Sequence, residues 1–190
     1  MLSLSNHDGI LMMKKQNRRQ ILKILTICLS FFFLFGCGYS FAPQGKYIEN
    51  RIQRVYVKSF DNKTAQAETE NYVRAAFINQ FLQNSRFKIV NNEASADAIV
   101  KGTVLSLNKS PLSYLKNNLT AQERATIILE VTFQENESGK IIWSSKNVTD
   151  SVDYAISEDI NLLSATRKQA LIQLANNVAE KAFNLMMSGF

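Results

Sequence analysis

Several stretches after residue 50 carry the residue pattern of β-strands. Alternation of apolar and polar residues indicates a half-buried strand, and a run rich in β-branched residues indicates a more deeply buried one. The predicted strands cover residues 52–60, 85–90, 99–108, 125–134 and 140–152. The clearest strand places Ile127, Leu129, Val131 and Phe133 on one face and Thr126, Ile128, Glu130 and Thr132 on the other. This alternation predicts a sheet with one buried face.

Glycine and proline positions predict where these strands bend or end. Pro111 is expected to end the strand that starts near residue 99, because proline cannot donate a hydrogen bond within a sheet. The residues that follow, to about 120, predict the tip of a hairpin. Gly102 is predicted to mark a bulge or a close backbone approach, and Gly139 to take the positive φ of a hairpin loop at 136–139.

Two longer stretches repeat apolar residues at helical spacing. The first helix is predicted over about 66–84, and the second runs from an N-cap at Ser157 to about Met187. The predicted core stripe of the first helix consists of Val73, Ala76, Phe77, Gln80 and Phe81, widened by Tyr72, Ile78 and Leu82. That of the second helix consists of Leu163, Ala170, Leu171, Leu174, Ala175, Val178, Ala179, Ala182 and Leu185.

The order of these elements is β-α-β-β-β-α, with a small extra strand after the first helix. This order predicts an α+β fold, a two-layer sandwich in which two helices pack on one face of a small mixed, mainly antiparallel sheet. Residues 51–190 are expected to form this single domain. The other sheet face would carry mixed side chains, which suits either docking against a partner or an ordinary solvated surface.

The N-terminal segment has the pattern of an export signal. A basic patch formed by Lys14, Lys15, Arg18 and Arg19 precedes an apolar run over residues 24–35. This run is shorter than the roughly 20 residues that a membrane-spanning helix needs. A start at Met12 or Met13 would give a better-proportioned signal, so a mis-assigned start over residues 1–11 is an alternative.

Cys37 stands where the apolar run stops. Leu34 and Gly36 lie three and one positions before it, which resembles the lipobox of bacterial lipoproteins. The resemblance implies that the Cys37 thiol is acylated and that the signal, residues 1–36, is cut immediately before it. Residues 37–50 would then be the lipidated N-terminus and tether. The alternative is an uncleaved membrane anchor with an incidental cysteine.

Removal of the signal changes the charge balance. The whole chain has a formal net charge of +6, but five of its 22 Lys and Arg residues and one of its 16 acids precede Cys37. The mature chain then has 17 basic and 15 acidic residues, a net charge of +2. A general nucleic-acid binder usually has a strongly basic domain, so we expect no nucleic-acid partner.

The same cleavage removes most catalytic side chains. The only histidine, His7, and one of the two cysteines, Cys28, lie in the signal segment. The mature chain therefore has no Ser–His or Cys–His nucleophile and no His or Cys metal site. The adjacent acids Glu158 and Asp159 are explained by a helix start, and no glycine-rich phosphate-binding motif occurs. The sequence thus favours a binding protein without a cofactor over an enzyme.

Six short strings, taken in order and spacing, resemble the LPS-assembly lipoprotein LptE family. They are C-G-Y at 37–39, V-Y-V-K-S-F-D-N-K-T at 55–64, A-D-A-I-V-K-G-T-V at 96–104, K-S-P-L-S-Y at 109–114, G-K-I-I-W at 139–143 and R-K-Q-A-L-I-Q-L-A at 167–175. The resemblance implies an outer-membrane lipoprotein that faces the periplasm and sits as a plug within the β-barrel of LptD. There it would support barrel assembly and help deliver lipopolysaccharide to the outer leaflet.

Recognition of an anionic glycolipid needs Lys or Arg side chains near a phosphate. In the family, a basic residue at the tip between two long strands is implicated in lipopolysaccharide contact, and by spacing it falls on Lys116. Lys109 is nearby on the same hairpin. The alternative for Lys116 is a solvated loop lysine. A second basic position of the family, just before the last helix, is occupied here by Ser157 or Glu158, which argues against a two-residue basic clamp.

Other functions remain as alternatives. The string at 55–64 also resembles outer-membrane lipoproteins that activate a peptidoglycan synthase or assemble a secretion channel. The strings G-K-I-I-W and P-L-S-Y favour the LptE family. Gly38, directly after Cys37, resembles the pattern of lipoproteins sent to the outer membrane. A lipid-anchored hydrolase would need paired carboxylates in a cleft, and the sequence indicates no such pair.

Overall fold

The computed structural model describes residues 48–114 and 120–189, which belong to one compact unit of the chain, residues 43–190. The elements, in order, are β1 (Arg54–Val57), β2 (Asp61–Asn62), α2 (Thr69–Gln83), β3 (Lys88–Ile89), the 3-10 helix η1 (Glu93–Ser95), β4 (Ala98–Tyr114), β5 (Thr120–Glu135), β6 (Ile141–Ala155) and α3 (Ile160–Ser188). The predicted α+β order is confirmed, and the short strand β2 is an addition to it.

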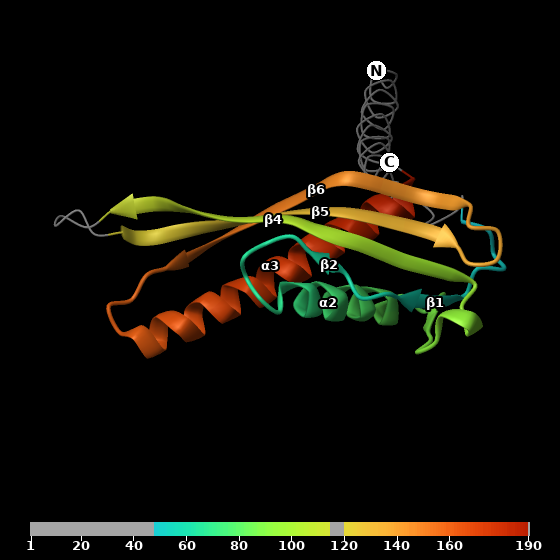
Figure 1. Cartoon of the computed structure of the whole chain (residues 1–190), viewed down its shortest axis with the longest axis horizontal. Coiled ribbons are helices and arrows are strands. Elements are labelled where there is room, and N and C mark those ends of the chain that lie inside the picture. Colours follow the sequence, from blue (N-terminus) through green and yellow to red (C-terminus); the bar gives the residue numbers. More distant parts are fainter. Residues whose placement is uncertain (1–47, 115–119, 190) are drawn as a thin grey trace, which may run out of the picture. The chain divides into compact units, whose positions relative to one another are not determined.

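The strands form a mixed sheet in the order β3-β1-β4-β5-β6, with β2 paired to β4 beyond the end of β1 (Figure 1). The short strand β1 pairs in parallel with β3 and with β4, and β2 pairs in parallel with β4. The long strands β4, β5 and β6 pair antiparallel. Because these three long strands make most of the pairing, the sheet is mainly antiparallel, as predicted.

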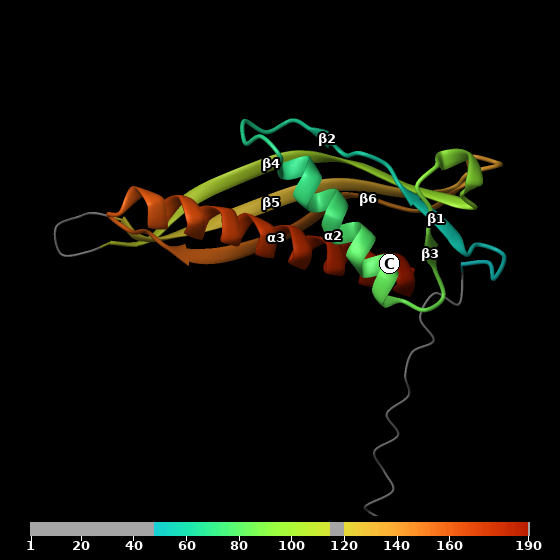
Figure 2. The ribbon, with the colours of Figure 1, turned by 90° about the horizontal axis from the view of Figure 1, so that it is seen from below.

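Both helices pack on the same face of this sheet (Figure 2). The alternation in β5 is confirmed, since Ile127, Leu129, Val131 and Phe133 are all buried beneath the helices. The ring of Phe81 on α2 contacts the ring of Phe183 on α3 edge to face, with centroids 5.1 Å apart. The core thus joins the two helices to each other and to the middle of the sheet.

Two glycine predictions are confirmed. A Cβ at Gly102 would collide with the carbonyl oxygen of Glu130 and would lie 2.7 Å from the ring of Phe60, so only glycine fits this position. Gly139 has a φ of 69° in the turn between β5 and β6. That left-handed conformation strains any residue with a Cβ.

The prediction that Pro111 ends its strand is wrong, because β4 continues to Tyr114. Pro111 pairs with Glu123 of β5, and the register shifts directly after it. On its other side β4 pairs with β2 only at Thr103 and Val104. Proline is tolerated at a sheet edge next to a bulge, where its missing N–H has no partner to lose.

Some details of the predicted helices also differ. The N-cap of α3 is Asp159, whose carboxylate accepts from the N–H groups of Asn161 at 2.8 Å and Leu162 at 3.3 Å. Ser157 instead accepts from the N–H of Asp159. Leu82 is 61% exposed because it falls outside the stripe of α2 that contacts the sheet and α3.

Side chains fasten the beginning of the described chain to one end of the sheet. Arg51 forms an ion pair with Glu135 at the end of β5. Arg86 donates hydrogen bonds to the carbonyl oxygens of Ile48 at 2.6 Å and Glu49 at 2.9 Å. The chain therefore enters the domain at the end of the sheet where β5 turns into β6.

The helices differ in how much of the sheet they cover. With 15 residues, α2 is about 22 Å long, whereas α3 with 29 residues is about 43 Å long. Strand β4, with 17 residues, spans about 56 Å. Beyond the first turn of α2, only α3 covers the sheet, and the candidate site lies along this stretch.

Candidate functional site

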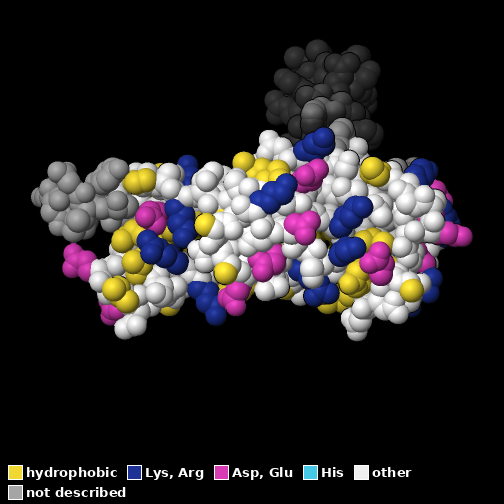
Figure 3. Space-filling view, viewed as in Figure 1, with side chains coloured by type: hydrophobic (Ala, Val, Ile, Leu, Met, Phe, Trp, Pro, Cys, Tyr) yellow, Lys and Arg dark blue, Asp and Glu magenta, His cyan; other side chains and the backbone are white. Residues whose placement is uncertain are grey.

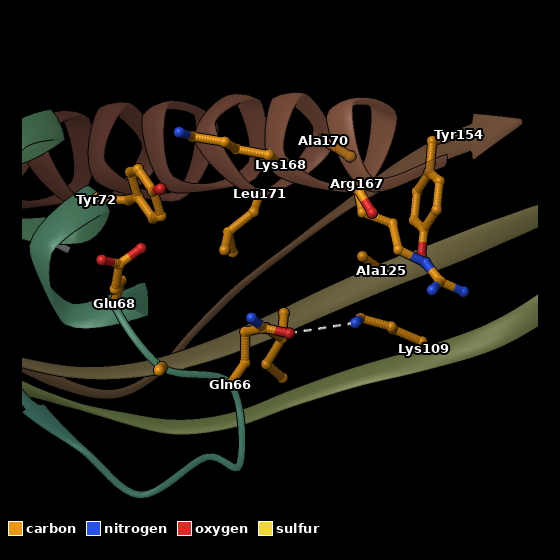
Figure 4. A pocket seen from close by; sticks show the side chains of 13 residues that line it. Gln66, Glu68, Tyr72, Lys109, Ala125, Tyr154, Arg167, Lys168, Ala170 and Leu171 are labelled. Atoms are coloured by element: carbon orange, nitrogen blue, oxygen red, sulfur yellow. Dashed lines mark hydrogen bonds between the residues drawn. The ribbon is translucent and has the colours of Figure 1, made fainter. Parts of the chain in front are cut away.

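A cavity of about 360 Å³ lies between α3 and the long strands, next to the first turn of α2 (Figure 4). It is lined by Gln66, Ala67, Glu68 and Tyr72 from the α2 region, by Leu107, Lys109, Ala125 and Tyr154 from the strands, and by Ser164, Arg167, Lys168, Ala170 and Leu171 from α3. We call this cavity the cationic groove, because three basic side chains and one acid line it.

The groove exists because α2 is short. Farther along α3, the face that contacts the sheet is closed by Leu174, Val178, Phe183 and Met186, all of which are buried. Toward the start of α3 that face has no second helix beside it, and most side chains before Ala170 are exposed. The same stripe of one helix thus changes from a sealed core to an open wall.

Lys109 reaches the groove from β4. It pairs with the buried Ala125 of β5, so it lies on the sheet face that carries the helices. Its ammonium is 3.4 Å from the side-chain oxygen of Gln66, a long contact with a neutral group. None of the ion pairs within residues 48–114 and 120–189 includes Lys109. Its charge is therefore available to a ligand.

Arg167 lies at the strand side of the groove, beside a cross-strand pair. Its guanidinium is 3.6 Å from the carboxylate of Glu123, which also accepts a 2.5 Å hydrogen bond from the phenol of Tyr154. Burial, together with the hydrogen bond to Glu123, raises the pKa of Tyr154 to about 12. The phenol therefore stays neutral and a donor at physiological pH, and Glu123 is shared by two donors.

Lys168 extends along α3 toward Tyr72, while Leu171 points into the space between the helix and the strands (Figure 4). Among the described residues, Lys168 takes part in no ion pair. Glu68, from the loop before α2, is the acid that lines the groove. Basic and hydrophobic side chains also lie side by side on the surface at this end of the strands and α3 (Figure 3).

The predicted site residues fare differently. Lys109 lies in the groove, whereas Lys116 and Cys37 are outside the described residues. Ser157 and Glu158 precede α3 as expected, and the basic side chains of this region come later, from the helix itself.

Sequence reasoning did not find Arg167 and Lys168 as site residues. A signal for them was present, because they lie three positions before Ala170 and Leu171 in the predicted stripe. Residues three apart share a helix face, so two adjacent basic residues fell on the side of α3 that turns toward the sheet. These two residues were missed because the whole stripe of α3 was interpreted as part of the hydrophobic core.

The other close ion pairs hold strands together. Asp97 accepts from Arg54 at 2.6 Å and from the N–H groups of Gln53 and Arg54. The guanidinium of Arg54, aided by these N–H groups, lowers the pKa of Asp97 to about 2. Arg124 on β5 binds Asp153 on β6 through two hydrogen bonds of 2.7 and 2.9 Å, on the face opposite the helices.

The described part of the chain has neither a metal-binding cluster nor a membrane-spanning helix. No group of three His, Cys, Asp or Glu side chains within it could hold a metal ion. Each of its helices is too short or too polar to cross a bilayer.

The fold is similar to that of solved lipoprotein structures, and one of them matches with a TM-score above 0.5. The lipoprotein B of Nitrosomonas europaea matches with a TM-score of 0.53 and 12% identity, over 80% of this chain and 92% of that one. PelC of Paraburkholderia phytofirmans matches with a TM-score of 0.46 and 12% identity, over 76% of this chain and 93% of that one. A comparison with curated proteins gives no significant match.

The domain is thus of the two-helix α+β class, with a mixed sheet and an open groove beside the last helix. The family model described as "LptE: Lipopolysaccharide-assembly" matches residues 52–186. The chain belongs to this family, and its role is in lipopolysaccharide assembly.

Proposed function

We propose that this protein is a lipid-anchored lipoprotein of the outer membrane that forms a complex with an LptD-type β-barrel. In this complex it supports assembly of the barrel and helps insert lipopolysaccharide into the outer leaflet. The observation that carries the proposal is the family match, which spans the domain from β1 nearly to the end of α3.

The proposal includes the domain organisation expected from the sequence. Residues 1–36 are a signal peptide, residues 37–50 are the lipidated N-terminus and tether, and residues 51–190 are the single LptE-like domain. Acylation of Cys37 is the anchor, because several acyl chains at about 0.8 kcal/mol per buried CH₂ hold a protein on a membrane far more firmly than one chain does.

The sheet face opposite the helices supports a polar interface with the barrel. Thr126 of β5 and Ser151 of β6 share a hydrogen bond of 2.8 Å on this face, beside the paired Arg124 and Asp153. Such a face, rich in hydroxyl groups and internally paired, suits the polar interior of an outer-membrane barrel.

The hairpin of β4 and β5 supports contact with lipopolysaccharide. Lys109 holds its charge on a rigid strand with no acid paired to it within the described residues, and we propose that Lys109 and Lys116 contact lipopolysaccharide phosphates. A lysine beside a phosphate forms a charge-assisted hydrogen bond, roughly twice as strong as a neutral one.

A pull-down of the tagged full-length protein from membranes in mild detergent tests the proposal. We expect a large β-barrel protein to co-purify. Recovery of a peptidoglycan synthase or a secretion-channel protein in its place would overturn it in favour of the alternative role. A Cys37→Ala variant serves as the control for anchoring, and we expect it to lose incorporation of labelled palmitate; unchanged incorporation would exclude Cys37 as the acylated residue.

A further inference from the structure

We propose that the cationic groove is a binding site for one phosphate group of an anionic lipid together with the adjoining part of an acyl chain. Arg167 and Lys109 would bind the phosphate, and Lys168 would add its charge on the side toward Tyr72. Leu107 and Leu171 would contact the apolar part. The identity of the lipid as lipopolysaccharide rests on the proposed function, whereas the assignment of the groove as a phosphate and acyl-chain site rests on its own residues.

The first argument is charge. Three bases from two separate elements line the groove together with one acid, Glu68. A second acid, Glu123, lies beside Arg167 and is shared with Tyr154. Like charges around one cavity repel each other, and Lys109 and Lys168 have no ion pair within the described residues that offsets this repulsion. A bound phosphate would neutralise them, and the planar guanidinium of Arg167 matches two phosphate oxygens at once.

The second argument is the apolar surface between these charges. Leu171 points from α3 into the groove (Figure 4), and Leu107 faces it from β4. Ala125 and Ala170 are small, so they leave room where larger residues would close the space. A free inorganic anion would gain nothing from such a surface. An ester that joins a phosphate to methylene groups would contact both parts.

The third argument is size. A volume of about 360 Å³ lies at the lower end of the roughly 300–1,000 Å³ typical of small-molecule sites. It cannot enclose a whole glycolipid. It can enclose a headgroup phosphate and a short stretch of chain, with the remainder of the lipid outside.

The fourth argument is the change of residue type along α3. On the part of the helix that meets α2, the face toward the sheet is apolar and sealed. Beside the first turn of α2 and beyond it, Arg167 and Lys168 occupy the turn before Ala170 and Leu171. The stripe of α3 thus becomes basic where no second helix covers it.

Binding to the full-length protein in a non-ionic detergent tests the site. The probes are fluorescent lipopolysaccharide, fluorescent phosphatidylglycerol and, as competitor, inorganic phosphate. We expect Arg167→Gln combined with Lys168→Gln to weaken lipid binding at least about tenfold and to reduce its dependence on salt, because two charged contacts are lost. A control with Lys88→Gln and Lys146→Gln, both exposed and outside the groove, should change binding less than about twofold.

A second variant separates charge from space. Leu171→Trp keeps all three bases but fills the groove, and we expect it to weaken lipid binding as well. Unchanged lipid affinity in both the Arg167/Lys168 variant and Leu171→Trp would overturn the site. The site would also be overturned if the wild-type protein bound neither lipid. It would likewise be overturned if the Arg167/Lys168 variant lost only its binding of inorganic phosphate while Leu171→Trp bound the lipids as the wild-type protein does.

The outcomes also separate this site from the proposed function. If Lys116→Glu abolishes lipopolysaccharide binding while the groove variants retain it, the groove is not the site and the proposed function stands. If the groove variants lose phosphatidylglycerol binding and the wild-type protein does not bind lipopolysaccharide, the groove stands and the proposed ligand falls.

Discussion

Tyr154 and Glu123 are direct cross-strand partners on β6 and β5, and the phenol of Tyr154 donates a 2.5 Å hydrogen bond to the Glu123 carboxylate. Arg167 of α3 reaches the same carboxylate at 3.6 Å. This arrangement fixes the start of α3 to the sheet at the edge of the cationic groove. Glu123 thus offsets the charge of one groove base, Arg167, whereas Lys109 and Lys168 take part in no ion pair within the described residues.

Tyr154→Phe should lower the free energy of unfolding by about 1.5–3 kcal/mol, because it removes a hydrogen bond to a charged acceptor. The pKa of Tyr154 is raised from 10.0 to about 12 by burial and by Glu123. Its stabilising contribution is therefore complete below pH 10 and lost as the pH rises from about 10 to 12. Urea unfolding across this range should show a smaller loss of stability in the variant.

Tyr56→Phe is the matched control, since Tyr56 is only half-buried on β1. We expect a change within about 0.5 kcal/mol, as for most surface positions. Equal stability of Tyr154→Phe and the wild-type protein at neutral pH would show that the hydrogen bond from Tyr154 to Glu123 does not stabilise the fold.

Asp97→Asn should destabilise the end of the sheet opposite the groove, because it removes the charge that Arg54 and two N–H groups stabilise. These donors lower the pKa of Asp97 from 3.8 to about 2. The contribution of Asp97 is thus complete above pH 3.8 and lost as the pH falls from about 3.8 to 2. Unfolding midpoints of variant and wild type should therefore converge in this acid range.

The control for this measurement is Asp61→Asn, because Asp61 is exposed on β2. It should shift the midpoint little at any pH. A stability difference for Asp97→Asn that persists unchanged down to pH 2 would show that the carboxylate charge is not the cause.

Gly102→Ala should cost about 1–3 kcal/mol of unfolding free energy, because its Cβ would meet the carbonyl oxygen of Glu130 and the ring of Phe60. Gly139→Ala is the comparison variant. Gly139 has a positive φ, but a Cβ added there would have no neighbouring atom within 4 Å, so its cost is conformational only, about 1 kcal/mol. Thermal or urea unfolding should rank Gly102→Ala as the more damaging, and the reverse order would refute the close contact.

Lys116→Glu should weaken lipopolysaccharide binding without unfolding the domain. The reason is charge repulsion between the new carboxylate and the phosphates. Binding of the purified protein to labelled lipopolysaccharide measures the effect, and an unchanged circular dichroism spectrum checks the fold. Affinity equal to that of the wild-type protein would remove Lys116 from the proposed contact.

The elements and layers of this fold were predictable because they depend on local patterns. The alternation in residues 125–134 fixed which face of β5 is buried, and the spacing of Val73, Phe77 and Phe81 fixed the core side of α2. Features that depend on neighbours in space were harder. Pro111 is compatible with β4 only because, among the described strands, β4 has no partner there on its other side, and a single sequence does not show that.

The cationic groove was less predictable than the fold. Lys109 was chosen through the family resemblance and its place on the hairpin, and the structure puts it beside residues that were assigned to the core helix. The groove depends on the difference in length between α2 and α3 and on where each lies along the sheet. Periodicity in one helix gives no information about where its neighbour ends.

The ion pair between Arg51 and Glu135 fixes where the chain enters the domain. Glu135 pairs with Ala98 at one end of β4, and Lys109 lies eleven positions farther along that strand, a distance of about 36 Å at the usual rise per residue. The entry point of the described chain and the groove are therefore at separate places along the same strand. A substitution that loosens the Arg51–Glu135 ion pair should leave the groove geometry unchanged.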